Sequence, residues 1–343
     1  MRFLDACALK PVDATPIWLM RQAGRFMPEY RAIRATLPFI EMCKRPDVAA
    51  EVTLQPVRAF ELDAAIVFAD ILLPLEGMGI GFHFTDADGP VIEKPVRTAA
   101  DLAPVHGIDP QRDVPYVLEA LRLVRRELDG RVPLVGFAGA PFTLASYVIE
   151  GGHSKNYAEV KGLMYREPDT FARLLALLAD VVVDYLLAQL DAGAQALQLF
   201  DSWVGALSPY DYERFVAPHS RSVLSRVGGH GAPVIHFANG AGGMLRAVRE
   251  AGGDVIGVDW RVDLGRAWDE IGHDRGIQGN LDPVALLGTP EAIEERAALV
   301  LRGAAGLPGH VFNLGHGILP TTPVDNVRFL VDAVHRLSSK GPA

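Results

Sequence analysis

Short apolar runs alternate with helical stretches along most of the chain. Such stretches are typical of an α/β protein, and 171–189 is one with leucines and valines at helical spacing. Near-continuous apolar runs of this length are typical of parallel strands that are buried on both faces. The runs occupy residues 64–68, 132–137, 196–200, 233–237, 255–258, 276–279 and 310–314.

The residues that follow these runs favour a closed barrel over an open sheet. Asp70, Ser202 and His316 each come shortly after a run, and turn-forming residues follow the others. In a barrel the carboxyl ends of all strands meet at one rim, whereas an open sheet needs such residues only at its switch point. The need for a turn after each strand explains the glycines that follow the runs, but it explains Asp70, Ser202 and His316 less well. We expect a single (β/α)8 TIM barrel that forms one domain over residues 1–343.

Three further features complete the predicted architecture. Residues 18–20 are a candidate eighth strand, although the closing strand could also be too degenerate to recognise. The segment 79–96, with Asp88 and Gly89 at its centre, predicts a β-hairpin insertion. The first 60 residues predict a helical and irregular lead-in to the barrel.

Composition and charge limit the functional classes. The 343 residues are 49% apolar and 22% charged, which is ordinary globular composition, and the net charge of −9 disfavours a nucleic-acid binder. Two cysteines are too few for a disulfide scaffold, and His236 at a strand end lacks a cysteine two positions later, so a zinc site with two thiolates is excluded. Asp5 interrupts any signal peptide, and no apolar stretch reaches about 18 residues. We expect a cytoplasmic protein without a membrane partner.

Arginines are abundant, so position must identify any functional one. Lysine accounts for 6 of the 33 basic residues, which leaves 27 arginines. Arg21 and Arg25 flank Gln22, Ala23 and Gly24, and two guanidinium groups four residues apart can face one anion. Guanidinium pairs with carboxylates in a bidentate geometry that lysine cannot match. The pair is either a carboxylate clamp or a solvated surface pair.

Titratable side chains follow the first and last runs. Asp70 lies in poorly hydrated surroundings, where a charge is costly unless it meets donors or cations, and capping of a helix is the alternative role. His316 lies between two glycines and is a ligand contact, a proton carrier or a solvated turn residue.

Two other strand ends carry aromatic and hydroxyl groups. Small residues in 136–152 leave room for a bulky ligand beside Tyr147, although the residue on its own fits a buried core tyrosine better. Phe200 precedes a strand-to-helix junction, where the Ser202 hydroxyl and backbone N–H groups form an anion seat. No Gly-x-Ser-x-Gly turn surrounds Ser202, so it is not expected to act as a nucleophile.

Taken together, these segments resemble the uroporphyrinogen decarboxylase family. The likeness spans essentially the whole chain, and the arginine segment and the Asn-Leu-Gly-His-Gly segment are the most specific parts. The resemblance implies a single (β/α)8 barrel, no cofactor, and a homodimer whose two clefts lie near each other. The similar segments, in family order, are 16–30, 66–74, 136–152, 197–203, 278–283 and 313–323.

The resemblance also assigns roles to individual residues. The family's loop that binds substrate carboxylates falls on residues 21–25, and its pyrrole-binding aspartate falls on Asp70. Ala238 stands where related methyl-transferring barrels need a zinc-binding cysteine, which favours the decarboxylase branch. The implied catalytic residues are Arg21, Asp70, Tyr147 and His316, and the implied substrate contacts add Gln22, Ala23, Gly24, Arg25, Phe200 and Ser202.

The implied reaction is the conversion of the four acetate side chains of uroporphyrinogen III to methyl groups. Its product is coproporphyrinogen III, an intermediate of haem biosynthesis. The identity of the proton donor, the order of the arms and the isomer preference stay open. Two alternatives are a barrel that carries or senses a tetrapyrrole without chemistry and a corrinoid methyltransferase of similar fold.

Overall fold

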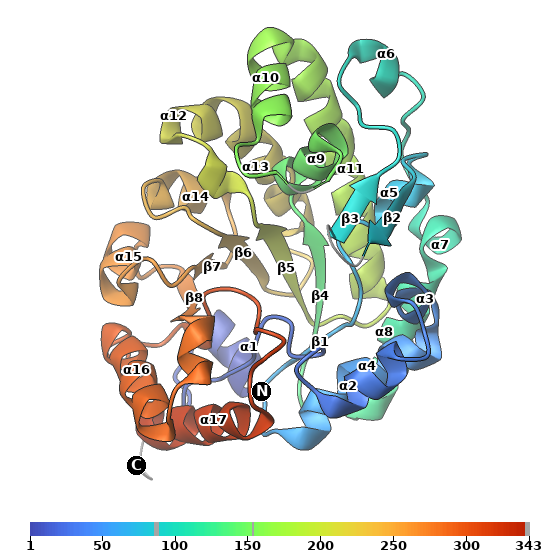
Figure 1. Ribbon diagram of the computed structural model, residues 1–343. Helices are drawn as coiled ribbons and strands as arrows, with labels where there is room; N and C mark the ends of the chain where they lie inside the picture. Colours follow the sequence, from blue (N-terminus) through green and yellow to red (C-terminus); the bar gives the residue numbers. More distant parts are fainter. Residues whose placement is uncertain (86–88, 153, 340–343) are drawn as a thin grey trace.

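A curled parallel sheet ringed by helices forms the centre of the molecule in the computed structural model, which describes residues 1–85, 89–152 and 154–339 (Figure 1). The seven predicted runs all form strands, and each strand pairs in parallel with the next one in the sheet. This arrangement confirms the α/β TIM barrel. The strands, in sheet order, are β1 (Ala65–Ile66), β4 (Leu134–Gly139), β5 (Ala196–Asp201), β6 (Val234–Ala238), β7 (Val255–Val258), β8 (Gly276–Leu281) and β9 (His310–Leu314).

The eighth position of the barrel is filled by a segment that scarcely qualifies as a strand. Ile17 forms one parallel bridge with Phe312 of β9, and the Phe312 amide donates to the Pro16 carbonyl at 2.8 Å. On the other side the Asp63 amide, just before β1, donates to the Ile17 carbonyl at 2.8 Å. Because Pro16 has no N–H to donate, the ladder stays short. The closing segment thus lies around Ile17, slightly before the candidate residues 18–20.

Helices cover the outside of the sheet. The lead-in contains α1 (Arg2–Cys7), α2 (Pro28–Arg34), α3 (Phe39–Lys44) and α4 (Pro46–Ala59). The predicted helix 171–189 lies within the long α11, which buries its leucine and valine face against the barrel. The other helices are α5 (Leu73–Gly77), α6 (Ala99–Leu102), α7 (Pro110–Asp113), α8 (Pro115–Leu128), α9 (Pro141–Glu150), α10 (Ala158–Arg166), α11 (Pro168–Asp191), α12 (Pro209–Asp211), α13 (Ala217–Val227), α14 (Leu245–Ala251), α15 (Leu264–Ile271), α16 (Pro290–Gly303) and α17 (Val324–Ser338), with 3-10 turns at Val204–Ala206 and Pro283–Leu287 and a π-helical turn at Tyr212–Val216.

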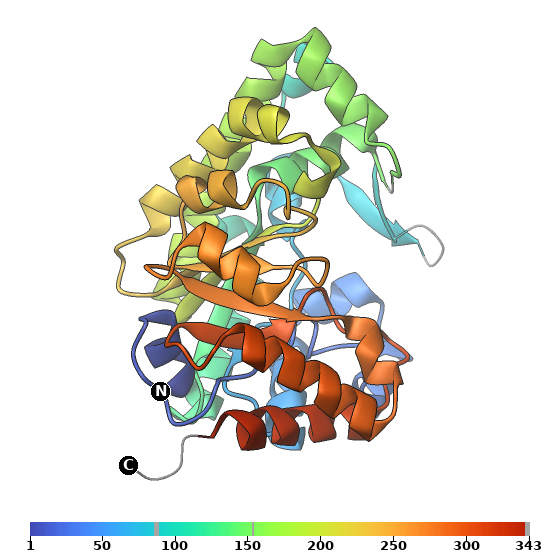
Figure 2. The same ribbon diagram turned by 90° about the vertical axis from the view of Figure 1, so that its left-hand side faces the viewer.

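The predicted hairpin is present as β2 (Phe82–Thr85) and β3 (Gly89–Ile92), which pair antiparallel. Asp88, expected at its centre, lies outside the described residues. Figure 2 shows the hairpin projecting from the body of the molecule. Its base is joined to the end of α9, because the Ile92 amide donates to the Gly151 carbonyl at 2.8 Å. The insertion therefore borders the helix that carries Tyr147.

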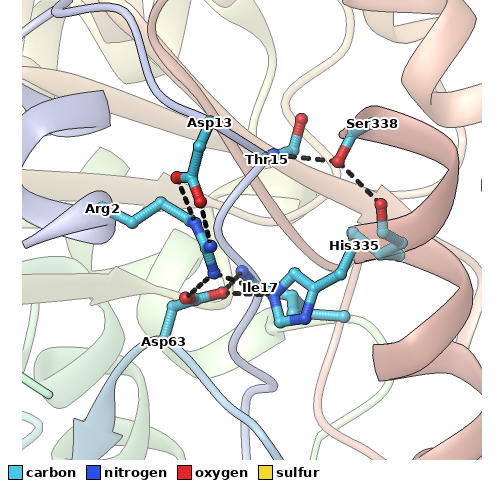
Figure 3. A network of polar contacts seen from close by, with 8 residues as sticks. Arg2, Asp13, Thr15, Ile17, Asp63, His335 and Ser338 are labelled. Carbon is cyan, nitrogen blue, oxygen red and sulfur yellow. Dashed lines mark hydrogen bonds and ion pairs between the residues drawn. The ribbon is translucent and has the colours of Figure 1, made fainter. Parts of the chain in front are cut away.

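A charged network fastens the two ends of the described chain to the amino ends of the strands (Figure 3). Asp63 accepts hydrogen bonds from Arg2 at 2.8 Å, from the Ile17 amide at 2.8 Å and from His335 of α17 at 2.7 Å. Arg2 also pairs with Asp13. One carboxylate thus links α1, the closing segment, β1 and α17.

No helix in the described part of the chain is long and apolar enough to cross a membrane.

Candidate functional site

The candidate site is the rim formed by the carboxyl ends of the strands. Asp70 follows β1, Tyr147 lies on α9 after β4, Ser202 follows β5 and His316 follows β9. Arg21 comes after the closing segment. Because the strands are parallel, all of these residues belong to one end of the barrel.

Arg21 is the common neighbour of three candidate residues. The charge of Arg21 lowers the pKa values of Asp70, Tyr147 and His316, and burial has a larger effect in each case. Burial raises the pKa values of Asp70 and Tyr147, and it lowers that of His316. The Arg21 side chain lies so close to Gly317 that a Cβ added there would be 2.5 Å from the Arg21 Cδ atom. The backbone of Arg21 has φ 64°, a left-handed conformation that is strained for a residue with a Cβ atom. Strain of this kind clusters at binding sites, and the surrounding loop holds it in place.

The loop around Arg21 is anchored by Gln22. The Gln22 side chain is buried, accepts a hydrogen bond from the Leu19 amide at 2.9 Å and donates one to the Ala64 carbonyl at 3.0 Å. A Cβ at Gly24 would lie 2.8 Å from the Arg21 carbonyl oxygen, so only glycine fits there. The Gln22 side chain therefore fixes the loop, and its amide group is already engaged by the protein.

The remaining loop residues have other neighbours than Arg21. Ala23 is buried, whereas Arg25 is exposed, as Arg21 is. Burial raises the pKa of Tyr30, and the charge of Arg25 opposes this effect, which places Arg25 near α2. The charge of Arg21 therefore acts on the other candidate groups, whereas that of Arg25 acts on Tyr30.

Asp70 does not cap the helix that follows it, because the N-cap residue of α5 is Leu72. The Asp70 Oδ1 atom accepts a hydrogen bond from the Leu72 amide at 2.9 Å, which closes a turn just before α5. Burial raises the pKa of Asp70 to about 6, while the Leu72 amide and the Arg21 charge act in the opposite direction. The group is thus mainly a carboxylate at neutral pH and takes up a proton in mildly acidic solution.

Tyr147 keeps its phenolic proton at neutral pH. Burial, and next the charge of Asp70, raise its pKa to about 12. Its ring contacts the Trp203 ring edge to face at 5.9 Å between centroids. These two residues also line a small cavity of about 90 Å³ together with Pro90 of the hairpin and Tyr157.

The end of β5 contributes an aromatic wall and a hydroxyl group. Phe200 is partly buried, and its ring packs edge to face on Phe137 at 5.6 Å and on Phe237 at 6.0 Å. Ser202 lies two residues later, and its carbonyl accepts a hydrogen bond from the Asn239 side chain at 3.1 Å. The backbone of the Ser202 turn is therefore fixed by the neighbouring strand end.

His316 is held in a neutral form. Burial lowers its pKa most, the charges of Arg21 and Arg261 lower it further, and Asp259 raises it. The Trp260 ring lies edge-on to the imidazole at 6.2 Å between centroids. A Cβ at Gly315 would overlap the Trp260 amide, so the glycine beside His316 permits this close approach.

Asp201 is a buried acid that the sequence reasoning did not single out. The Thr143 hydroxyl donates to its Oδ1 atom at 3.0 Å, while its Oδ2 atom has no hydrogen-bond partner in the described residues. Burial raises the pKa of Asp201 to about 7. The signal was available, because an acid at the end of an apolar run is unusual.

Arg261 was also missed, although it directly follows two rim residues, Asp259 and Trp260.

The described residues contain no group of three or more histidines, cysteines, aspartates or glutamates arranged to hold a metal ion. A larger cavity, of about 550 Å³, lies at the opposite end of the barrel between the lead-in, α16 and the end of α17.

Comparison with known proteins gives a consistent result. The sequence pattern of the family "Uroporphyrinogen decarboxylase (URO-D)" matches residues 1–337. The uroporphyrinogen decarboxylase of Carboxydothermus hydrogenoformans is 60% identical over 337 residues, which is 98% of this chain and 96% of that protein. The enzyme of the same name from Geobacter sulfurreducens is 53% identical over 99% of both chains. Among solved structures, a methyltransferase from Methanosarcina mazei has a TM-score of 0.82 at 22% identity, over 98% of this chain and 97% of that one, and shares the fold.

Proposed function

The chain belongs to the uroporphyrinogen decarboxylase family and acts in porphyrin biosynthesis, and we propose that the rim around Arg21 is where it removes CO2 from uroporphyrinogen III. All four acetate arms become methyl groups, and the product is coproporphyrinogen III. The observation that supports this site is the position of Arg21 at the carboxyl ends of the strands, with its side chain against Gly317 beside His316 and its charge acting on Asp70, Tyr147 and His316.

The chemistry defines what the site must supply. When the bond between an acetate methylene and its carboxylate breaks, the electron pair needs an acceptor. Protonation of the adjacent pyrrole carbon makes the ring a cation, which accepts that pair as CO2 leaves. The resulting exocyclic methylene then gains a proton to become methyl, and the ring carbon releases the one it took up. The net reaction consumes one proton per CO2, so an acid, an anion and carboxylate-binding cations are needed.

Asp70 suits the anion. Pyrrole N–H groups that point inward would satisfy its partly buried carboxylate, and the negative charge would stabilise the ring cation as it forms. With a pKa of about 6 the group is ionised at neutral pH without further help. Arg21, which lies close enough to lower that pKa, would hold a carboxylate arm of the substrate beside it.

The protonation states favour Tyr147 as the proton donor. Tyr147 holds its proton throughout the neutral range, because its pKa is about 12. His316 is neutral in the substrate-free protein, since burial and the charges of Arg21 and Arg261 lower its pKa. A neutral imidazole can still donate a hydrogen bond to a carboxylate, so His316 suits substrate binding, as do Ser202 and Phe200 at the neighbouring strand end.

The direct test is anaerobic incubation of the protein with uroporphyrinogen III, with no added metal or cofactor. The products are oxidised and separated by their number of carboxyl groups. We expect a series from eight carboxylates down to four. Recovery of the unchanged octacarboxylate from folded protein would contradict the proposal and favour a binding or methyl-transfer role.

We extend the family resemblance to quaternary structure and propose a homodimer whose two clefts lie near each other. Light scattering after size-exclusion chromatography should give twice the 37.1 kDa chain mass. A mass of one chain at micromolar concentration would contradict this proposal.

We also propose a cytoplasmic location, which agrees with the absence of a membrane-spanning helix among the described residues. Fractionation of the source cells should recover the activity in the soluble fraction. Recovery with membranes after a salt wash would contradict it.

A further inference from the structure

Arg261 is a rim cation to which neither the resemblance nor the relatives assign a role. It lies three residues after the last residue of β7, and its side chain is 54% exposed. Two neighbouring strand ends contact it, because it interacts with Asn239 after β6 as well as with its own segment. An exposed arginine on a protein surface usually moves freely, so its surroundings decide whether it is organised for binding.

The guanidinium of Arg261 is held by three contacts. Its central carbon lies 3.9 Å from the centre of the Trp260 ring, within the range of a cation–π contact. Its Nη1 atom lies 3.3 Å from the Asp259 carboxylate and 3.4 Å from the Asn239 side-chain oxygen. The Asp259 carboxylate is itself fixed by two backbone amides, those of Gly240 and Arg261. The guanidinium is therefore oriented in advance.

The contacts leave part of the guanidinium available. Both polar contacts use Nη1, and within the described residues the Nε and Nη2 atoms of Arg261 donate no hydrogen bond. These two atoms form one edge of the guanidinium plane, which is the edge that binds a carboxylate through two parallel hydrogen bonds.

Arg261 and Arg21 approach His316 from its two flanks. The Arg21 side chain packs on Gly317, and the Trp260 amide packs on Gly315. Arg261 in turn lies over the Trp260 ring. Both guanidinium groups lower the pKa of the imidazole, after the effect of burial. Two guanidinium groups beside a neutral histidine make this part of the rim locally positive on a chain whose net charge is −9, and such a region attracts an anionic substrate.

We propose that Arg261 binds a carboxylate arm of the tetrapyrrole on the Gly315 side of His316, as a specificity-determining partner to Arg21. The inference rests on the proposed function, because that function supplies a substrate with eight carboxylates. Arg261 takes no part in bond breaking. It holds the macrocycle in the cleft, so its removal weakens binding and leaves the chemical steps unchanged.

The test compares three variants with the wild type in the anaerobic assay. Arg261→Met removes the charge and keeps an unbranched side chain, and Arg261→Lys restores the charge without the planar edge. Arg122→Gln is the matched control, since Arg122 is an exposed arginine on α8 that pairs with Glu119. We expect Arg261→Met to raise KM about fivefold at low salt with kcat within about twofold, as for one partly exposed ion pair. We expect Arg261→Lys to recover part of this loss and Arg122→Gln to match the wild type.

The outcomes separate this inference from the proposed function. A KM for Arg261→Met equal to that of Arg122→Gln would overturn the inference. So would an equal fall in kcat for Arg261→Met and Arg261→Lys, which would indicate a structural role. If the wild type and Arg122→Gln released no CO2, the proposed function itself would fail. As a readout independent of turnover, the pKa of His316 followed by NMR should rise in substrate-free Arg261→Met, and an unchanged value would contradict the geometry.

Discussion

At the scale of single residues, burial and the charge of Arg21 determine the protonation states of Asp70, Tyr147 and His316 at the rim. Asp70 and Tyr147 are both shifted upward by burial, but from different ordinary values, so one is a carboxylate and the other a phenol at neutral pH. Arg21 opposes both shifts and adds to the downward shift of His316. At neutral pH one of these neighbouring groups is therefore an anion, while the phenol and the imidazole are both uncharged, which fits the roles proposed for them as anion, acid and neutral ligand.

This assignment of roles predicts different kinetic effects for two substitutions. Tyr147→Phe keeps the ring against Trp203 and removes the proton, so kcat should fall by roughly 10²- to 10⁴-fold with little change in KM. His316→Asn replaces the imidazole by a shorter amide that does not reach as far into the site, so KM should rise while kcat changes little. Steady-state kinetics with uroporphyrinogen III check both. A large loss of kcat in His316→Asn alone would move the donor role to the histidine.

Single residues also show where sequence reasoning succeeds and where it stops. Asp70 and His316 could be placed at one rim because the ends of parallel strands converge, whatever the details of packing. Asp201 could have been found at the end of its apolar run, but a sequence does not reveal that one of its oxygens lacks a partner. Nor does it reveal that the neighbouring strand end approaches Arg261. The exposure of Arg25 likewise depends on the path of its loop.

At the scale of elements, the bond between Thr143 and Asp201 joins α9 to β5. Thr143 lies one helical turn before Tyr147, and Asp201 directly precedes Ser202. Two groups of the candidate site are therefore positioned by one buried contact. Tyr212 of the adjacent π-helical turn also faces this acid, because Asp201 contributes to its raised pKa after burial.

The raised pKa of Asp201 predicts a pH-dependent stability. Its pKa is about 7 in the folded protein and about 4 in the unfolded chain, so folding takes up a proton between these values. The stability that this group contributes is present below about pH 4 and is lost as the pH rises through about 7. Asp201→Asn should therefore gain stability relative to the wild type from pH 5 to pH 8.5, by on the order of a few kcal/mol. Urea unfolding at both pH values checks this, and a constant difference would contradict it.

The elements themselves were largely predictable, and the exceptions have physical causes. Buried parallel strands are nearly all apolar, so β4 to β9 stand out in the sequence. The segment around Ile17 does not, because it makes one bridge only and begins with a proline. The hairpin β2–β3 could be predicted from its turn-forming centre. Its attachment to α9 could not, because it depends on backbone hydrogen bonds, which leave no pattern in the sequence.

At the scale of the whole molecule, one end of the barrel carries the candidate site and the other end carries the network around Asp63. There, Asp63 fastens the weak eighth position through Ile17 and holds α1 and α17 through Arg2 and His335 (Figure 3). Its side chain is 10% exposed, so the loss of its charge would leave partners unpaired in a poorly hydrated place. We therefore expect Asp63 to stabilise the closed barrel and to have little effect on the candidate site at the opposite end.

We expect Asp63→Ala to lower the free energy of unfolding by about 3 kcal/mol, because it leaves His335 and the Ile17 amide without their acceptor and leaves Arg2 with Asp13 alone. Asp180→Ala is the control, since Asp180 forms an exposed pair with Arg226 and should cost less than about 1 kcal/mol. We further propose that residues 1–343 form one domain that unfolds in a single transition. Calorimetry checks both points, and two separate transitions would contradict the single domain.

The central claim is that the ionised carboxylate of Asp70 stabilises a ring cation, and the pH dependence of kcat/KM for wild type and Asp70→Asn tests it most directly. In the wild type kcat/KM should fall about tenfold per pH unit below about 6, because the protonated acid cannot act as the anion. Asp70→Asn should be roughly 10²- to 10³-fold slower at pH 7.5 and should lack this fall. Near-normal turnover in Asp70→Asn, or the same acidic fall in both proteins, would contradict the account.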